Sequence, residues 1–153
     1  MDQPNRPPSA DLTIPGEAPR RPLYSPKQVA AAAFLGSPIA GCWLLASNFD
    51  ALDQPATRRR SLLWGLLSTL VLFVLSLFLP KSFPNSVLPI AYTVAIYHLA
   101  TQYQGAAFAA HRAAGGSRYS SWRVAGIGLA FLAAVAIVFI GIALLLPESL
   151  LPD

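Results

Sequence analysis

The sequence predicts an all-α integral membrane protein, because it is poor in charge, rich in apolar residues and divided into long charge-free stretches. Charged residues make up 12% of the 153 residues and hydrophobic residues 54%, whereas soluble domains carry about 25% charged residues. A helix of about 20 residues crosses a hydrocarbon core of about 30 Å. The stretches that reach this length without a charge are residues 28–49, 61–80, 82–111 and 124–147. We expect three spanning helices plus an amino-terminal hairpin, with four spanning helices as the alternative.

The two ends of the chain differ in character from its middle. Residues 1–22 are rich in proline and polar groups and contain no apolar run, which predicts a disordered tail. The membrane domain is expected over residues 23–147, followed by a short tail over residues 148–153.

The first helical segment is expected over residues 26–52. Ser25 suits the N-cap position, and Pro26 suits the first helical position, where no amide donor is needed. The segment is then interrupted by proline, which cannot donate to the residue four back and clashes with that carbonyl. The expected break lies at Gly36, Ser37 and Pro38. It leaves either a re-entrant hairpin or a kinked helix that still spans.

Two further segments are the most apolar of the chain. Residues 58–79 are leucine-rich, and a proline follows them; residues 122–146 consist largely of Val, Ile, Leu, Ala, Phe and Gly. Small side chains at every fourth position let two membrane helices approach closely. In the last segment this spacing predicts a packing face at Gly126, Ala130 and Ala134.

The segment over residues 87–109 is more polar than the others. His98 and Gln102 are four residues apart and so share one face of a helix, with Thr101 beside them. Polar groups exposed to lipid are costly, so we expect this face to point into the protein. His98 is open to two interpretations: a functional group on an ion or proton path, or a residue that only bonds a neighbouring helix.

The basic residues set the expected topology, because they favour the cytoplasmic side of a membrane. A re-entrant hairpin leaves every lysine and arginine except Lys81 on one side, whereas four spans divide them between both sides. We therefore prefer the hairpin and a cytoplasmic amino terminus. The arginines expected to anchor the cytoplasmic interface are Arg58, Arg59, Arg60, Arg112, Arg118 and Arg123. Anchoring alone accounts for them, and specific binding of anionic lipid is the alternative.

No catalytic or metal-binding pattern is present, so we expect neither an enzyme nor a cofactor. The acidic residues lie in the tails and the first loop, and we place none of them in a spanning helix. A metal site normally needs at least three convergent ligands, and Cys42 has no cysteine partner. The modest net charge of +4 is explained by topology and does not predict nucleic-acid binding.

One part of the chain resembles a known kind of protein. Residues 23–52 carry Tyr24-Ser25-Pro26-x-Gln28, then Phe34-Leu35-Gly36-Ser37-Pro38-x-Ala40-Gly41, and Asn48-Phe49. This signature resembles the opening of a family of small uncharacterised bacterial inner-membrane proteins. The resemblance implies a bacterial inner membrane and no particular activity.

These observations favour a non-enzymatic role in the bilayer. We expect a multi-pass protein that acts through contacts with another membrane protein or with itself, as an accessory subunit or an immunity-type protein. The alternative is an oligomeric channel or small-solute transporter, with His98, Thr101 and Gln102 lining the path.

Overall fold

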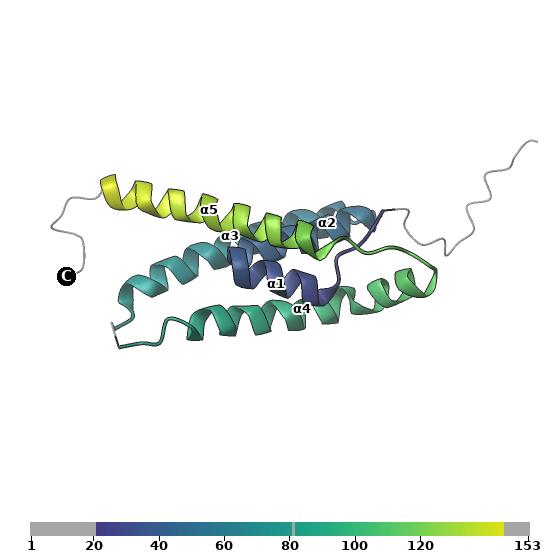
Figure 1. Cartoon of the computed structure of the whole chain (residues 1–153), viewed down its shortest axis with the longest axis horizontal. Helices are drawn as coiled ribbons and strands as arrows, with labels where there is room; N and C mark the ends of the chain where they lie inside the picture. The colour runs from purple at the N-terminus through teal and green to yellow at the C-terminus, as the bar shows by residue number, and fades with distance from the viewer. Residues whose placement is uncertain (1–20, 81, 146–153) are drawn as a thin grey trace, which may run out of the picture.

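Five helices follow one another in the described part of the chain, and the first two form a short antiparallel hairpin (Figure 1). The structure is a computed structural model that describes residues 21–80 and 82–145. The helices are α1 (Pro26–Gly36), α2 (Pro38–Ala51), α3 (Pro55–Phe78), α4 (Val87–Ala113) and α5 (Ser121–Leu145). The predictions made for most of the two tails and for Lys81 therefore fall outside the described residues.

The hairpin forms because the sequence gives a start and a stop to two short helices in succession. The Ser25 hydroxyl accepts a hydrogen bond from the Gln28 backbone N–H, and the Gln28 side chain accepts one from the Ser25 N–H, which completes a capping box. At the other end, α1 stops at Gly36 and α2 starts at Pro38. Ser37, between them, has a φ of 85°, a backbone conformation that reverses the chain.

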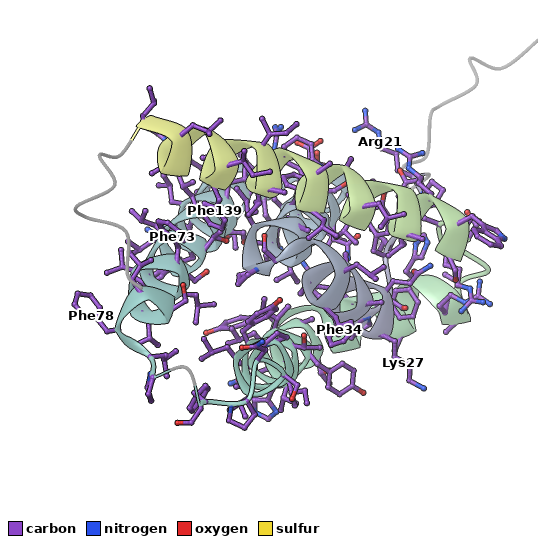
Figure 2. All side chains as sticks on the ribbon, turned by 60° about the vertical axis from the view of Figure 1, so that its left-hand side comes forward. Arg21, Lys27, Phe34, Phe73, Phe78 and Phe139 are labelled. Carbon is purple, nitrogen blue, oxygen red and sulfur yellow. The ribbon has the colours of Figure 1, made fainter. Side chains whose placement is uncertain are left out.

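The hairpin lies at the centre of the molecule and supplies most of its core. Helix α3 packs on α2, whereas α4 and α5 pack mainly on α1. Among the described residues, only three buried hydrophobic residues come from outside the segment that holds the hairpin: Ile96, Ala100 and Val124. The three long helices extend beyond the hairpin tip (Figure 1), where Phe73 of α3 and Phe139 of α5 stack with ring centroids 4.0 Å apart (Figure 2).

Glycines allow the hairpin to approach its neighbours closely. A Cβ on Gly36 would collide with the Gly128 carbonyl oxygen, and a Cβ on Gly128 would lie 2.9 Å from the Leu35 Cβ. A Cβ on Gly65 would meet the Cys42 side chain. Helix α5 therefore rests on α1 where Gly36 and Gly128 meet, and α3 rests on α2 where Gly65 meets Cys42.

Two of the helices in the described residues are long and apolar enough to span a membrane, Pro55–Phe78 and Ser121–Ile142. Only 6% of the most apolar 18-residue stretch of each is buried, so neither is a buried core helix of this chain. The three or four such helices expected from the sequence are not found. Helices α1 and α2 have 11 and 14 residues, which is too short, and polar residues lower the hydropathy of α4.

The exterior of the long helices is correspondingly apolar. Large hydrophobic side chains point outward along all three, and Phe78 is 80% exposed at the far end of α3 (Figure 2). A soluble monomer rarely exposes apolar surface on this scale.

Candidate functional site

A buried cluster of side-chain amides ties the open end of the hairpin to α4. Asn48 accepts a hydrogen bond from the Tyr24 backbone N–H and donates to the Tyr24 carbonyl, both at 2.8 Å. It also donates to the Gln104 Oε1 at 2.8 Å, and the Gln104 Nε2 donates to the Leu45 carbonyl at 2.9 Å. Buried polar groups are tolerated when they are satisfied in this way. The amide cluster thus fixes α1, α2 and α4 at one point.

A second set of contacts ties the same end of the hairpin to the start of α5. The Gln28 Nε2 donates to the Tyr119 carbonyl at 2.7 Å. The Tyr24 and Tyr119 rings stack with centroids 4.3 Å apart, and the Arg123 guanidinium lies 4.5 Å from the Tyr119 ring centroid. Burial raises the pKa of the Tyr24 phenol, an effect that nearby Arg123 partly opposes. Tyr24 is therefore neutral at physiological pH and serves as a packing group.

The closed end of the hairpin borders a cleft of about 370 Å³ between the three long helices. The Ser37 hydroxyl lies in the wall of this cleft, buried and without a hydrogen-bond partner among the described residues. The Ile39 backbone N–H donates to the Thr69 hydroxyl at 3.1 Å, which holds the tip against α3. The remaining polar groups of the lining are Ser76, Asn85 and Tyr92. No carboxylate or imidazole of the described residues lines the cleft, so its groups can bind a ligand but offer no general acid or base of the usual kind.

The expected polar face of α4 lies on the outside of the chain. His98, Thr101 and Gln102 are all exposed, so the expectation that this face points into the chain's own interior is wrong. The inward face instead carries Ile96, Ala100 and Gln104. The physical reason is that the alanine-rich hairpin accepts small and apolar side chains, and only Gln104 meets polar partners there.

The small residues expected to pack on α5 also lie on the outside. Gly126, Ala130 and Ala134 are exposed, and a Cβ added to Gly126 would have nothing within 4 Å. The face that contacts the hairpin holds Val124 and Gly128, which lie on a different side of the same helix. Packing within the chain therefore does not use the predicted stripe.

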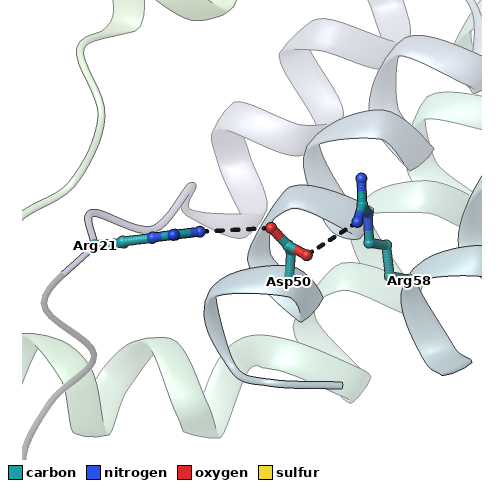
Figure 3. A network of polar contacts seen from close by, with 3 residues as sticks. All are labelled: Arg21, Asp50 and Arg58. Carbon is teal, nitrogen blue, oxygen red and sulfur yellow. Dashed lines mark hydrogen bonds and ion pairs between the residues drawn. The ribbon is translucent and has the colours of Figure 1, made fainter. Parts of the chain in front are cut away.

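The described charged residues all lie at one end of the molecule, where α1, α3 and α5 begin and α2 and α4 end. Asp50 lies between two arginines, 3.6 Å from Arg21 and 3.1 Å from Arg58 (Figure 3). Arg112 donates to the Gly116 carbonyl at 2.8 Å. The four other predicted anchors are exposed and form no salt bridge within the described residues: Arg59, Arg60, Arg118 and Arg123. We call the end of the molecule that holds these charged residues the basic end.

The two remaining residues with reactive side chains, Cys42 and His111, are buried by packing within the fold. Cys42 is buried against α3, and no group of three metal-binding side chains occurs among the described residues. His111 is buried at the end of α4, with its Nε2 2.9 Å from the Ser117 carbonyl oxygen. Comparisons of the chain with protein-family models, curated proteins and solved structures found no match.

Proposed function

We propose that this chain is a multi-pass membrane protein in which α3, α4 and α5 cross the bilayer. The hairpin of α1 and α2 then enters from the basic end and returns to it. Two features support this placement: the apolar exterior of the long helices and the confinement of the described charges to one end. The positive-inside rule puts the basic end in the cytoplasm. We propose a bacterial inner membrane as its location, and the resemblance of the hairpin sequence supports this choice.

Helix α4 is the third span in this proposal, although it is more polar than α3 and α5. Its 27 residues are long enough to cross. Gln104, on its inner face, is satisfied by the hairpin. The short hairpin helices reach only part of the depth, and their turn is shielded by the long helices, as irregular backbone at membrane depth requires.

The functional proposal is based on the outer face of α4, which holds His98 and Gln102. His98 is 14 positions before Arg112, about 21 Å along the helix axis, which places it well inside a hydrocarbon core of about 30 Å. Neither His98 nor Gln102 is hydrogen-bonded within the described residues through its side chain, and both are exposed. Since polar groups facing lipid are costly, another helix is expected to cover them.

The pattern around this pair suits helix pairing. The exposed or half-buried small residues on the same stripe are Ala91, Ala95, Gly105 and Ala109. With His98 and Gln102 they follow alternating steps of four and three, the spacing of a left-handed helix pair. Small residues allow close approach, and polar residues hydrogen-bond across such interfaces. We therefore assign the protein a non-enzymatic role in which α4 binds another transmembrane helix, as an accessory subunit or immunity-type protein does.

The test is gentle solubilisation of the tagged full chain from its native membrane, followed by native mass spectrometry. We expect a bound partner that is lost in the His98→Leu/Gln102→Leu variant. Ser76→Leu, which replaces an exposed polar residue of α3 by the same side chain, is expected to keep the partner. A wild-type chain that is monomeric in every preparation, or a partner retained by the double variant, would contradict the proposal.

A homo-oligomer through the same face would favour a second function. His98, Thr101 and Gln102 lie outside the single chain, so any path that they line must run between copies. In that case the protein is a channel or small-solute transporter. Solute flux in liposomes that is abolished by His98→Ala would establish this role, and an oligomer without flux would leave the interaction role.

A further inference from the structure

A second cleft, of about 470 Å³, lies between α3 and α4 near the basic end, with α2 as its floor. The two long helices do not pack closely on each other here, because each rests on the hairpin. Trp64 of α3 and Tyr103 of α4 flank the opening and are 67% and 68% exposed. In the membrane placement proposed above, the cleft therefore opens sideways toward lipid.

The lining of this cleft changes from polar to apolar with depth. Thr57, Arg60 and Ser61 line it close to the start of α3 at the basic end. Trp64 follows one turn further along α3, and Leu45 and Leu99 line the apolar part. A phospholipid has the same order of groups, from the phosphate through the ester-linked glycerol to the acyl chain.

The charge at the polar end suits an anion. Asp50 lies beside Arg58 and Arg21 and does not line the cleft. Arg60 forms no salt bridge within the described residues, and no described carboxylate lines the cleft with it. The planar guanidinium of arginine matches a phosphate with two parallel hydrogen bonds. The start of α3 adds partial positive charge to the same place.

The size of the cleft favours a lipid over a helix as its occupant. A helix about 10 Å in diameter would fill 470 Å³ within about one turn, too little for a stable helix pair. A flexible acyl chain can enter so narrow a space. We propose that the cleft binds one anionic phospholipid from the leaflet at the basic end, with its phosphate on Arg60 and one acyl chain against Leu99 and Leu45. This inference rests on the proposed membrane placement.

Trp64 provides the readout for a test in vesicles. The full chain carrying Trp43→Phe and Trp122→Phe retains Trp64 as its single tryptophan. It is reconstituted into phosphatidylcholine vesicles that contain a fixed fraction of either brominated phosphatidylglycerol or brominated phosphatidylcholine. Brominated chains quench a tryptophan that they touch. We expect stronger quenching by the phosphatidylglycerol, which reports selection of the anionic lipid at the cleft.

Two matched variants assign the selection to Arg60. Arg60→Gln is expected to lower the relative affinity for phosphatidylglycerol about fivefold, the equivalent of ~1 kcal/mol for one juxtamembrane arginine. Arg59→Gln removes the same charge from the neighbouring position, which does not line the cleft, and is expected to leave the selection unchanged. Leu99→Phe, which places a larger side chain in the apolar part without adding a second tryptophan, is expected to reduce quenching by both lipids.

The remaining outcomes separate this inference from the membrane placement. Equal quenching by the two lipids would show an inserted chain without the lipid site, and it would overturn the inference alone. Equal losses in Arg60→Gln and Arg59→Gln would show diffuse surface charge and would also overturn it. No quenching by either lipid would show that Trp64 does not enter the bilayer and would overturn both proposals.

Discussion

Asn48 and Gln104 hold the hairpin to α4 through hydrogen bonds that are sealed from water. Each amide has its oxygen and at least one N–H paired, and removing one partner leaves the others buried without compensation. An unsatisfied buried donor or acceptor costs about 1–3 kcal/mol. The stability of the hairpin therefore depends on these few side chains more than on any exposed residue of α4.

Gln104→Ala is expected to destabilise the protein by about 2 kcal/mol, because the Asn48 amide and the Leu45 carbonyl lose their partner. Gln102→Ala, the same change two residues away at an exposed position, is expected to have little effect on the isolated chain. Denaturant unfolding in detergent micelles measures both. Equal losses for the two variants would contradict the assignment of Gln104 as the clamp.

Ser37→Gly is expected to stabilise the protein by about 1 kcal/mol. Ser37 has a φ of 85°, where an L-residue with a side chain is strained and glycine is not. The substitution also removes a buried hydroxyl that has no hydrogen-bond partner within the described residues. The melting temperature in micelles is the measurement. A lower melting temperature would show that the hydroxyl has a partner, and the cleft beside the hairpin tip would be the place to find it.

The sequence identifies some of these residues and misses others. Ser25, Pro26 and the break at Ser37 follow from rules that act within a few residues, and the structure has the cap and the break at those positions. Asn48 and Gln104 pair across 56 positions, so neither is recognisable from its neighbours. Two signals point to the pair: Asn48 belongs to the amino-terminal signature, and Gln104 continues the four-residue spacing of Ile96 and Ala100.

At the scale of elements, the hairpin takes the place that a long central helix has in other bundles. Its alanines and glycines allow α3, α4 and α5 to pack around two short helices. Sequence periodicity predicts where the helices lie, but it does not predict which face of α4 or α5 contacts the hairpin. That choice depends on the shape of the hairpin surface. The face of α4 that was predicted to point inward therefore lies outside, and the small-residue stripe predicted on α5 does not contact the hairpin.

Gly128→Val is expected to loosen α5 from the hairpin and to cost about 2 kcal/mol or more, because the added side chain collides with Leu35. Gly126→Val, on the same helix, meets open space and is expected to be tolerated. Both variants change a helical glycine to the same residue, so helix propensity cancels in the comparison. Unfolding in micelles distinguishes them, and similar stabilities would contradict the docking face assigned to α5.

At the scale of the whole molecule, the asymmetry of charge is the dominant feature. Every described charged residue lies at one end, and the opposite end, where α3 finishes and α4 starts, carries none within the described residues. The sequence already indicates this arrangement through the spacing of its arginines. The structure adds that the hairpin begins and ends at the basic end (Figure 1). If the chain spans a membrane, the start of α1 and the end of α4 should therefore lie on the same side, and the connection between α3 and α4 should lie on the other.

Cysteine accessibility in intact cells tests the central claim most directly, with Cys42 replaced by alanine. Lys27→Cys, Ala114→Cys and Asn85→Cys each place one exposed thiol, the first two at the basic end and the third at the opposite end. The account predicts that a membrane-impermeant reagent labels Asn85→Cys in intact cells and labels the other two only after permeabilisation. Labelling of Lys27→Cys together with Asn85→Cys would show that the first helical segment crosses the membrane, and it would contradict the re-entrant hairpin.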